Sequence, residues 1–194
     1  MRPLVPKGLL VVISAPSGCG KTTVIQHLLQ QNKAMVRAVT ATTRKQRKGE
    51  VQGRDYFFIT EKEFQEKRRK HDFLEWAEVY GFHYGTLKRA TLDELGKGKN
   101  VILTIDVQGA RQVRKKVEGV FIFIMPPSME VLEKRLRLRK SDSARQIEKR
   151  LMQAREEIAC AKEYDYIVTN HDVDESVAAI ESIIAKKKEN EKRR

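Results

Sequence analysis

LLVVI at residues 9–13, followed directly by SAPSGCGKTT at residues 14–23, carries the strongest structural signal in this sequence. The apolar run predicts a buried strand, because strands covered on both faces read as continuous apolar segments. The glycines that follow allow successive backbone N–H groups to point at phosphate oxygens. Residues 22–30 then place apolar side chains on one helical face. The stretch therefore predicts a strand, a phosphate-binding loop and a helix whose N-terminus adds partial positive charge.

The loop matches the P-loop pattern GxxxxGK[ST] except at its first position, where Ala15 replaces glycine. We expect Lys21 to reach the β- and γ-phosphates of ATP, and the Thr22 hydroxyl to ligate Mg²⁺. A glycine-rich turn with a chance lysine is the alternative, and the strand–loop–helix context argues against it. P-loops serve motors, GTPases, transporters and kinases alike, so the loop alone leaves the function open. The predicted ATP-binding residues of the loop are Ala15, Pro16, Ser17, Gly18, Cys19, Gly20, Lys21, Thr22 and Thr23.

Three further apolar runs, at residues 101–105, 120–125 and 166–169, alternate with helical patterns. This alternation predicts an α/β fold with a doubly wound parallel sheet. Residues 145–162 predict a long amphipathic helix. Asp174 is expected to be the N-cap of a last helix.

Two stretches interrupt this rhythm and are interpreted as insertions. Residues 40–88 fit short strands and one helix, which opens with Thr60 and Glu63 spaced as a capping box. Residues 130–150 are rich in arginine and lysine. We therefore expect a core made of residues 1–39, 89–129 and 151–194, with insertions at 40–88 and 130–150.

Size and composition limit the alternatives. The chain has 194 residues, which suits one α/β domain with small insertions. It carries two distant cysteines, so we expect a reducing, cytoplasmic setting rather than a disulfide framework. The longest early apolar run is far short of the ~20 residues of a membrane span, and no signal peptide is visible. We expect no membrane partner.

The net charge of +13 raises the question of nucleic acid. Part of this charge lies in the basic tail at residues 186–194, and the other clusters fall on helix-like segments without interleaved aromatic residues. We therefore expect no specific nucleic-acid partner. The alternative, a nucleic-acid-binding protein, predicts steeply salt-dependent affinity for random oligonucleotides.

Several segments lie in a characteristic order along the chain: SAPSGCGKTT at 14–23, TTRKQRKGEVQGRDYFF at 42–58, FLEWAEVYGFHYGT at 73–86, IDVQG at 105–109, PPS at 126–128 and the arginines from Arg135 to Arg150. Through these segments the sequence resembles the guanylate kinase family from Gly8 to Ile184. The resemblance implies a P-loop NTPase core with a small mixed α+β GMP-binding insertion at 40–88 and a helical lid at 130–150. It implies transfer of the γ-phosphoryl of Mg·ATP to GMP, and to dGMP, in purine nucleotide recycling.

The resemblance also assigns the acceptor site. Arginine forks and tyrosine hydroxyls suit a dianionic phosphate, and a carboxylate suits the adjacent N1–H and 2-amino donors of guanine. Taken singly, each side chain would be read as a surface arginine, a core tyrosine or an exposed glutamate. The resemblance implies that Arg44, Arg47, Tyr56 and Tyr84 bind the GMP phosphate, that Glu75 reads guanine, and that Thr40, Gly85, Thr86, Thr104 and Asp106 complete the GMP site.

Thr104 departs from the family pattern, which commonly has an acidic residue there. A hydroxyl accepts a weaker, neutral hydrogen bond than a carboxylate does. We therefore expect GMP selectivity to depend more heavily on Glu75 in this chain. Asp106 is expected to orient an arginine or a Mg²⁺-bound water, or to cap the helix that follows it.

Phosphoryl transfer between two polyanions requires positive charge around the moving group. The resemblance assigns this task to Arg135, Arg139 and Arg150, and places Asn170 near the adenine. A solvated basic helix is the alternative for the arginine run. The predicted catalytic residues are Lys21, Arg44, Arg135, Arg139 and Arg150.

Two other functions stay open on the sequence alone. One is a non-catalytic guanylate-kinase-like binding module, and the other is a P-loop kinase with a different acceptor. The retained Lys21, Arg44 and Glu75 argue against the first, and the FLEW and YGT segments argue against the second. The sequence is compatible with a monomer or a homo-oligomer.

Overall fold

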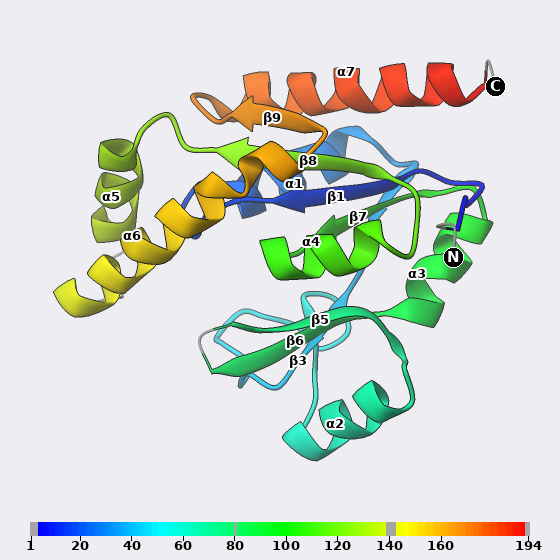
Figure 1. The fold of residues 1–194 in the computed structure, drawn as a ribbon, viewed down its shortest axis with the longest axis horizontal. Coiled ribbons are helices and arrows are strands. Elements are labelled where there is room, and N and C mark those ends of the chain that lie inside the picture. The colour runs from blue at the N-terminus through cyan, green and yellow to red at the C-terminus, as the bar shows by residue number, and fades with distance from the viewer. Residues whose placement is uncertain (1–3, 80, 139–142, 193–194) are drawn as a thin grey trace. The chain divides into compact units, whose positions relative to one another are not determined.

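The computed structural model, which describes residues 4–79, 81–138 and 143–192, contains a five-stranded parallel sheet (Figure 1). The strand order is β2-β7-β1-β8-β9. The predicted α/β fold with a parallel sheet is confirmed, and four of its strands lie within one residue of their predicted bounds. Their bounds are β1 Leu10–Ser14, β7 Asn100–Thr104, β8 Val120–Met125 and β9 Tyr166–Thr169, joined by the unpredicted β2 at Met35–Arg37.

Helices connect these strands, as the alternating pattern predicted. Helix α1 buries Val24, Ile25 and Leu28, and it packs against α7. The long amphipathic helix predicted at residues 145–162 is α6, which begins after a Ser143 capping box. The helices are α1 Lys21–Gln31, α3 Lys88–Gly96, α4 Val107–Arg114, α5 Met129–Leu138, α6 Ala144–Ala159 and α7 Val173–Lys192, with a 3-10 turn η1 at Ala161–Glu163.

The predicted cap of the last helix is wrong by two residues. The Oδ1 atom of Asp172 accepts from the backbone N–H groups of Asp174 and Glu175, at 2.8 and 3.2 Å. Asp174 therefore lies inside the first turn of α7. Its carboxylate is 3.4 Å from the His27 Nδ1 of α1.

A second, four-stranded sheet occupies the insertion predicted at residues 40–88. Its strand order is β4-β3-β6-β5, with β3 and β4 parallel and the other pairs antiparallel. Helix α2, Glu61–Arg69, opens with the predicted Thr60–Glu63 capping box. Its one buried residue, Phe64, stacks on Phe73. The strands are β3 Thr40–Thr42, β4 Tyr56–Phe58, β5 Phe73–Val79 and β6 Phe82–Leu87.

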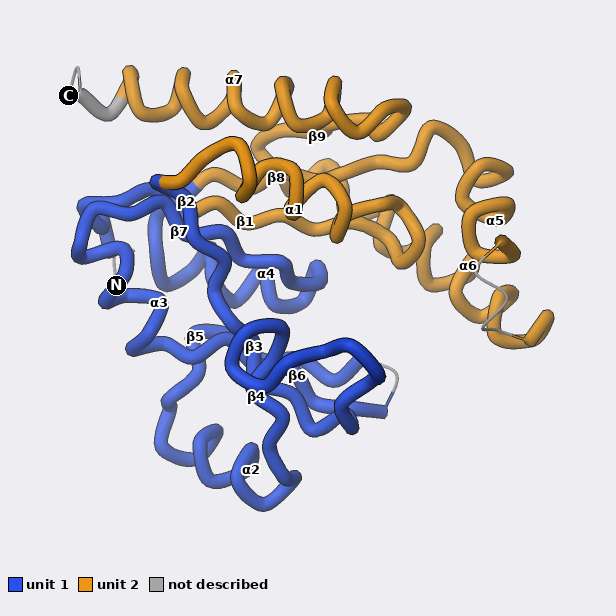
Figure 2. The backbone as a smooth tube through the Cα atoms, turned by 180° about the vertical axis from the view of Figure 1, so that it is seen from behind, with its two compact units in different colours: residues 1–10, 34–119 blue, residues 11–33, 120–194 orange. Residues whose placement is uncertain are grey.

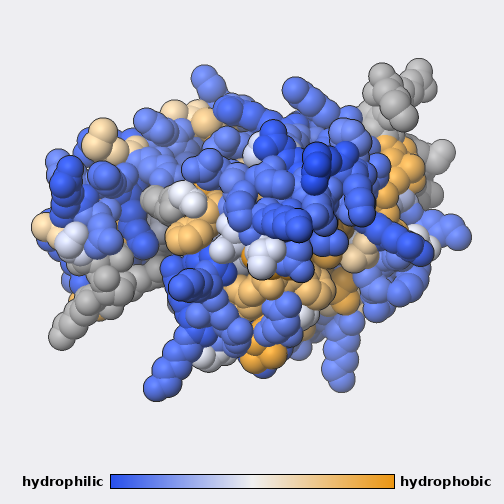
Figure 3. All heavy atoms as spheres, turned by 90° about the horizontal axis from the view of Figure 1, so that it is seen from below, coloured by the Kyte–Doolittle hydropathy of each residue, from blue (hydrophilic) through white to orange (hydrophobic). Residues whose placement is uncertain are grey.

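The chain divides by contact density into two compact units (Figure 2). The first unit contains residues 1–10 and 34–119, and the second contains residues 11–33 and 120–194. Hydrophilic side chains cover much of the face drawn in Figure 3, between smaller apolar patches. Within the described ranges, no helix is both long and apolar enough to cross a membrane. The predicted division into a core, an insertion and a lid stays a prediction.

Candidate active site

The loop between β1 and α1 depends on glycine at two positions. Gly18 and Gly20 have φ values of +93° and +92°, in the left-handed region that L side chains rarely adopt. Gly20 is also the N-cap of α1, where a Cβ would lie 2.6 Å from the Asn170 amide nitrogen. Ala15 has no such requirement, since His71 is the only non-glycine residue with positive φ in the described part of the chain. The alanine that weakens the motif therefore fits the backbone.

The carbonyl oxygen of Cys19 anchors this loop within the second unit. It accepts from the Asn170 Nδ2 at 2.7 Å and from the Arg135 Nη1 at 3.2 Å. Asn170 is 2% exposed, and the Ser176 hydroxyl donates to its Oδ1 at 3.0 Å. The Cys19 N–H donates to the Pro16 carbonyl at 3.2 Å. These contacts fix the orientation of the peptide groups through which a P-loop binds phosphate.

The thiol of Cys19 is buried beneath the loop. Burial raises the pKa of Cys19 to about 12, although the positive charges of Arg135 and Lys21 oppose the shift. The Sγ atom lies 3.5 Å from the Ile124 carbonyl oxygen. Because the thiolate is the nucleophilic form, the raised pKa disfavours reaction of this thiol at neutral pH.

The remaining residues predicted to act on ATP differ in their position and exposure. Lys21 is the first residue of α1, and Thr22 and Thr23 are exposed on its first turn. Arg150 is half-buried on α6, and Arg139 lies outside the described residues. Arg137, to which no role was assigned, pairs with Glu133 one turn earlier at 2.6 Å.

Arg44 is a buried, hydrogen-bonded basic residue among those predicted to bind GMP. It is only 8% exposed, and its guanidinium binds both carboxylate oxygens of Glu50, at 2.7 and 3.0 Å. A third bond runs from Nη1 to the Lys45 carbonyl at 2.7 Å. The guanidinium also lies 5.3 Å from the Tyr56 ring centroid and 5.8 Å from that of Phe58. These contacts fix its position while leaving part of its donor set uncommitted.

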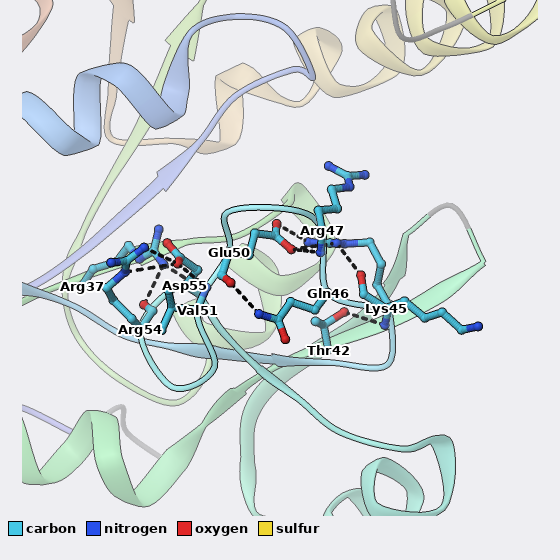
Figure 4. A network of polar contacts seen from close by, with 10 residues as sticks. Arg37, Thr42, Lys45, Gln46, Arg47, Glu50, Val51, Arg54 and Asp55 are labelled. Carbon is cyan, nitrogen blue, oxygen red and sulfur yellow. Dashed lines mark hydrogen bonds and ion pairs between the residues drawn. The ribbon is translucent and has the colours of Figure 1, made fainter.

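The same carboxylate organises the loop that follows β3. Glu50 accepts from the backbone N–H of Arg47 at 2.7 Å (Figure 4). Hydrogen bonds from the Arg44 side chain are the main reason that the pKa of Glu50 lies below its ordinary value. The Arg47 guanidinium is exposed and makes no hydrogen bond or ion pair with any described residue. The exposed guanidinium of Arg47 therefore follows closely in sequence on the buried guanidinium of Arg44, which is bound to Glu50.

Two tyrosines predicted to bind the acceptor phosphate lie close together. The rings of Tyr56 and Tyr84 meet edge to face, with centroids 6.1 Å apart. Burial is the main reason that the pKa of Tyr56 lies above its ordinary value, and the nearby Tyr84 adds to this shift. The Tyr56 hydroxyl therefore stays protonated and able to donate a hydrogen bond. Thr40 pairs in register with Tyr56 on one side and Thr86 on the other. Gly85 is buried under Phe73, where a Cβ would come within 2.8 Å of the ring.

Glu75 is a buried carboxylate on β5 and is 3% exposed. Its Oε1 accepts from the backbone N–H of Thr86 at 3.0 Å and from the Thr86 hydroxyl at 2.5 Å. Burial raises the pKa of Glu75 to about 7; the Thr86 bonds oppose this shift, and the charge of Asp106 adds to it. A carboxylate that is shielded from water in this way forms strong hydrogen bonds with any donor that reaches it.

Asp106 is the N-cap of α4, which was one of the roles expected for it. Its Oδ1 accepts from the Gly109 N–H at 2.8 Å. Thr104 is half-buried at the end of β7. Both residues belong to the first unit, together with Glu75 and Arg44.

The sequence did not single out several residues that contact the predicted site. Glu50 holds Arg44, Ser176 holds Asn170, and Gln112 holds the backbone beside Glu75. Their separations in sequence follow no helical or strand period, so no pattern could have identified them. The predicted acceptor residues on β3, β4, β5 and β6 lie on one sheet, whereas the predicted donor residues lie in the second unit.

The parallel sheet and the anchored glycine loop at the N-terminus of α1 define a P-loop α/β protein. The family model described as guanylate kinase matches residues 7–187. This chain therefore belongs to the guanylate kinase family.

Similar proteins agree with this family over nearly their full length. The guanylate kinase of Carboxydothermus hydrogenoformans is 45% identical over 96% of this chain and 92% of its own. That of Clostridioides difficile is 48% identical over 95% of this chain and 90% of its own. The crystal structure of guanylate kinase from Anaplasma phagocytophilum superposes with a TM-score of 0.76 at 37% identity, covering 95% of this chain and 88% of that one.

Proposed function

We propose that this chain transfers the γ-phosphoryl group of ATP to GMP, giving ADP and GDP, and that it also accepts dGMP. The observation that carries the acceptor assignment is the buried Glu75 carboxylate, which lies on the same sheet as Tyr56 and Tyr84, while Arg44 in the loop after β3 lies over the Tyr56 ring. The Glu75 carboxylate suits the hydrogen-bond donors of the guanine edge, and the cluster of Arg44, Tyr56 and Tyr84 suits a phosphate dianion. Family membership supplies the reaction that joins them.

In this reaction an oxygen of the GMP phosphate attacks the γ-phosphorus of ATP. The new P–O bond forms as the bond to the β,γ-bridging oxygen breaks, and ADP leaves with that oxygen. No covalent enzyme intermediate is needed, so catalysis consists of positioning and charge stabilisation. Arg44 and Arg47 would bind the acceptor phosphate, with Tyr56 and Tyr84 donating to the same oxygens.

The donor side follows from the anchored loop. Its backbone N–H groups and Lys21 would bind the ATP phosphates, while Arg135, Arg139 and Arg150 would neutralise charge as the phosphoryl group moves. Asn170 would position the loop through Cys19, and its proposed contact with adenine is separate from that role.

The site residues fit a magnesium ion carried by ATP. Mg²⁺ is bound mainly by substrate phosphates and water, and it needs few protein ligands. The exposed Thr22 hydroxyl on the first turn of α1 supplies one hard oxygen of the right kind. When bound, the ion would neutralise charge on the phosphates of ATP. Asp106 would orient a water of the ion or an arginine.

The substrates would place the protein in purine nucleotide recycling in the cytoplasm. An assay that couples ADP formation to NADH oxidation, offering GMP, dGMP, AMP, UMP or CMP with Mg·ATP, tests the proposal. We expect turnover with GMP and dGMP and little with the others. A folded sample that forms no ADP in the presence of GMP would contradict the proposal and favour a binding module.

A further inference from the structure

Strand β5 contains a register shift directly before Glu75. Phe73 pairs with Leu87 and Glu75 pairs with Thr86, so two steps along β5 match one step along β6. Residues that lie directly opposite in a sheet share a face, and successive residues alternate faces. The bulge at Leu74 therefore places Phe73 on the face that packs against Phe64, and Glu75 on the opposite face with Thr86.

Helix α4 and the turn after it bind the backbone on both sides of Glu75. The Gln112 Nε2 donates to the Trp76 carbonyl at 2.7 Å, and the Gln112 Oε1 accepts from the Trp76 N–H at 3.2 Å. The Lys116 Nζ donates to the Leu74 carbonyl at 2.5 Å. Because β5 is an edge strand, these groups have no neighbouring strand to bind. The Gln112 amide takes the place of a peptide group on that strand.

Gly109, one turn before Gln112, lies against the Glu75 carboxylate. A Cβ at Gly109 would overlap the Glu75 Oε2 and would lie 3.1 Å from its Cδ. The backbone there is an ordinary helix with its N–H bound to Asp106, so glycine is needed for space rather than for φ. Alanine is the better helix former, by about 1 kcal/mol. The absent side chain makes room for the carboxylate.

The two carboxylate oxygens of Glu75 differ in their hydrogen bonds. Oε1 accepts both Thr86 bonds, whereas no donor from the described residues bonds Oε2. A carboxylate oxygen without a protein donor keeps its lone pairs available to a donor of the ligand. The guanine edge offers two adjacent donors, N1–H and the 2-amino group.

We infer that Gln112 and Gly109 are positioning residues for guanine selectivity: Gln112 locks the bulge that aims Glu75, and Gly109 leaves space for its Oε2. The inference rests on the proposed function and deepens it. Neither residue touches the substrate in this arrangement. Both act by fixing the carboxylate that reads the 2-amino group, so their loss reduces the distinction between GMP and inosine monophosphate, which lacks that group.

Gln112→Met tests this inference, because methionine keeps the length of the side chain and removes both hydrogen bonds. Gln65→Met is the matched control on α2 of the same unit, where the Gln65 amide binds only the side chains of Glu61 and Arg68. We expect Gln112→Met to raise the KM for GMP about tenfold, which is the loss of roughly one charged hydrogen bond. We expect kcat and the KM for ATP to stay within about twofold of wild type.

Gly109→Ala distinguishes a positioning role from a purely structural one, because a structural role would not change the selectivity between GMP and inosine monophosphate. We expect the variant to stay folded with a lowered thermal midpoint, because the helix preference of alanine, about 1 kcal/mol, offsets only part of the cost of displacing the buried carboxylate. The ratio of kcat/KM for GMP over inosine monophosphate should nevertheless fall about tenfold in both variants. A ratio that stays unchanged in both, or an equal loss for both acceptors, would overturn the inference.

Calorimetric binding of GMP and inosine monophosphate without ATP separates the inference from the proposed function. Intact, selective GMP binding without phosphoryl transfer contradicts the proposed function only. Binding by both variants with wild-type selectivity contradicts the inference only. We expect reduced selectivity in the two variants and unchanged selectivity in Gln65→Met.

Discussion

Arg44 donates to both carboxylate oxygens of Glu50, through Nη1 at 3.0 Å and through Nη2 at 2.7 Å. The hydrogen bonds that Arg44 donates to Glu50 are the main reason that the pKa of Arg44 lies above its ordinary value. A guanidinium carries five N–H donors; these two bonds and the one to Lys45 use three of them, and a hydrogen bond to Tyr84 engages a further one. Glu50 therefore fixes the orientation of Arg44 without consuming its capacity to bind a phosphate.

The first prediction concerns this pair. Glu50→Gln keeps the shape of the side chain but replaces one acceptor oxygen with a donor, so it cannot hold Arg44 through two acceptors. We expect the KM for GMP to rise about tenfold, as for the loss of one charge-assisted hydrogen bond. We expect the KM for ATP to stay within about twofold, as measured by steady-state kinetics with each substrate varied in turn.

Asp55→Asn is the matched control for this variant. Asp55 lies in the same loop, accepts from the Val51 N–H at 2.8 Å and pairs with Arg54 at 3.0 Å (Figure 4). Arg54 is exposed and is not part of the predicted site. An equal rise in the KM for GMP in both variants would mean that Glu50 acts only by holding the loop.

The second prediction is that GMP binding releases protons near neutral pH. Because the pKa of Glu75 is raised to about 7, a large fraction of the carboxyl is protonated in the free protein at pH 6 to 7. The guanine donors require the carboxylate form, so binding expels that proton. Calorimetry in buffers of different ionisation enthalpy measures the release. The GMP phosphate, whose second pKa is about 6, releases protons as well when its dianion binds. Glu75→Gln should therefore lower the release to the share of the phosphate, and a release equal to that of the wild type would contradict the assignment.

The third prediction follows from the same raised pKa. A carboxyl whose folded pKa is raised stabilises the fold fully below its ordinary pKa of 4.5, and this contribution is lost as pH rises through about 7. We expect the free protein to lose on the order of 3 kcal/mol from this group over that window. Urea unfolding at pH 5 and pH 8 should show a smaller difference in Glu75→Gln than in the wild type.

The fourth prediction concerns the two cysteines. Cys19 is buried with its pKa raised to about 12, whereas Cys160 is partly exposed at the end of α6. Iodoacetamide at pH 8 should therefore modify Cys160 well before Cys19 in the folded protein, as peptide mass mapping would show. In urea the two rates should become similar. Rapid modification of Cys19 in the native state would contradict the buried position of its thiol.

The fifth prediction tests the anchor of the glycine loop. Asn170→Ala removes the bond to the Cys19 carbonyl and leaves a buried cavity, at a cost of about 1 to 3 kcal/mol in stability. We expect the KM for ATP to rise severalfold while GMP affinity, measured by calorimetry without ATP, stays unchanged. A variant that weakened GMP binding equally would show a general loss of structure.

Local signals predicted much of this fold because its strands are uniformly apolar and its helices periodic. The strand ending at Ser14 and the capping box at Thr60 are examples in which neighbouring residues determine the outcome. Strand β2 escaped prediction because its three residues, MVR, show no pattern of their own and are defined by pairing with β7. The cap at Asp172 was missed because two nearby aspartates satisfy the same preference.

The loop residues were predicted from the motif and its context, whereas the acceptor residues, the lid arginines and Asn170 came from family resemblance; the roles of all of them stay predictions. What the sequence could not supply is the set of residues that hold them. The pairing of Arg44 with Glu50 depends on a loop conformation, and the contact of Gln112 with Trp76 joins residues 36 apart. Such contacts are consequences of tertiary packing, which leaves no periodic trace in the sequence.

The hydrogen bonds that Gln112 makes along β5 have a consequence for solubility. An edge strand with free N–H and C=O groups is a template for strands of other molecules and thus for aggregation. At Trp76 both groups are occupied by a side-chain amide, and the Leu74 carbonyl is occupied by a lysine that also brings charge to the edge. The contacts that aim one carboxylate also prevent intermolecular strand addition at this point of the sheet, so selection for either property preserves the other.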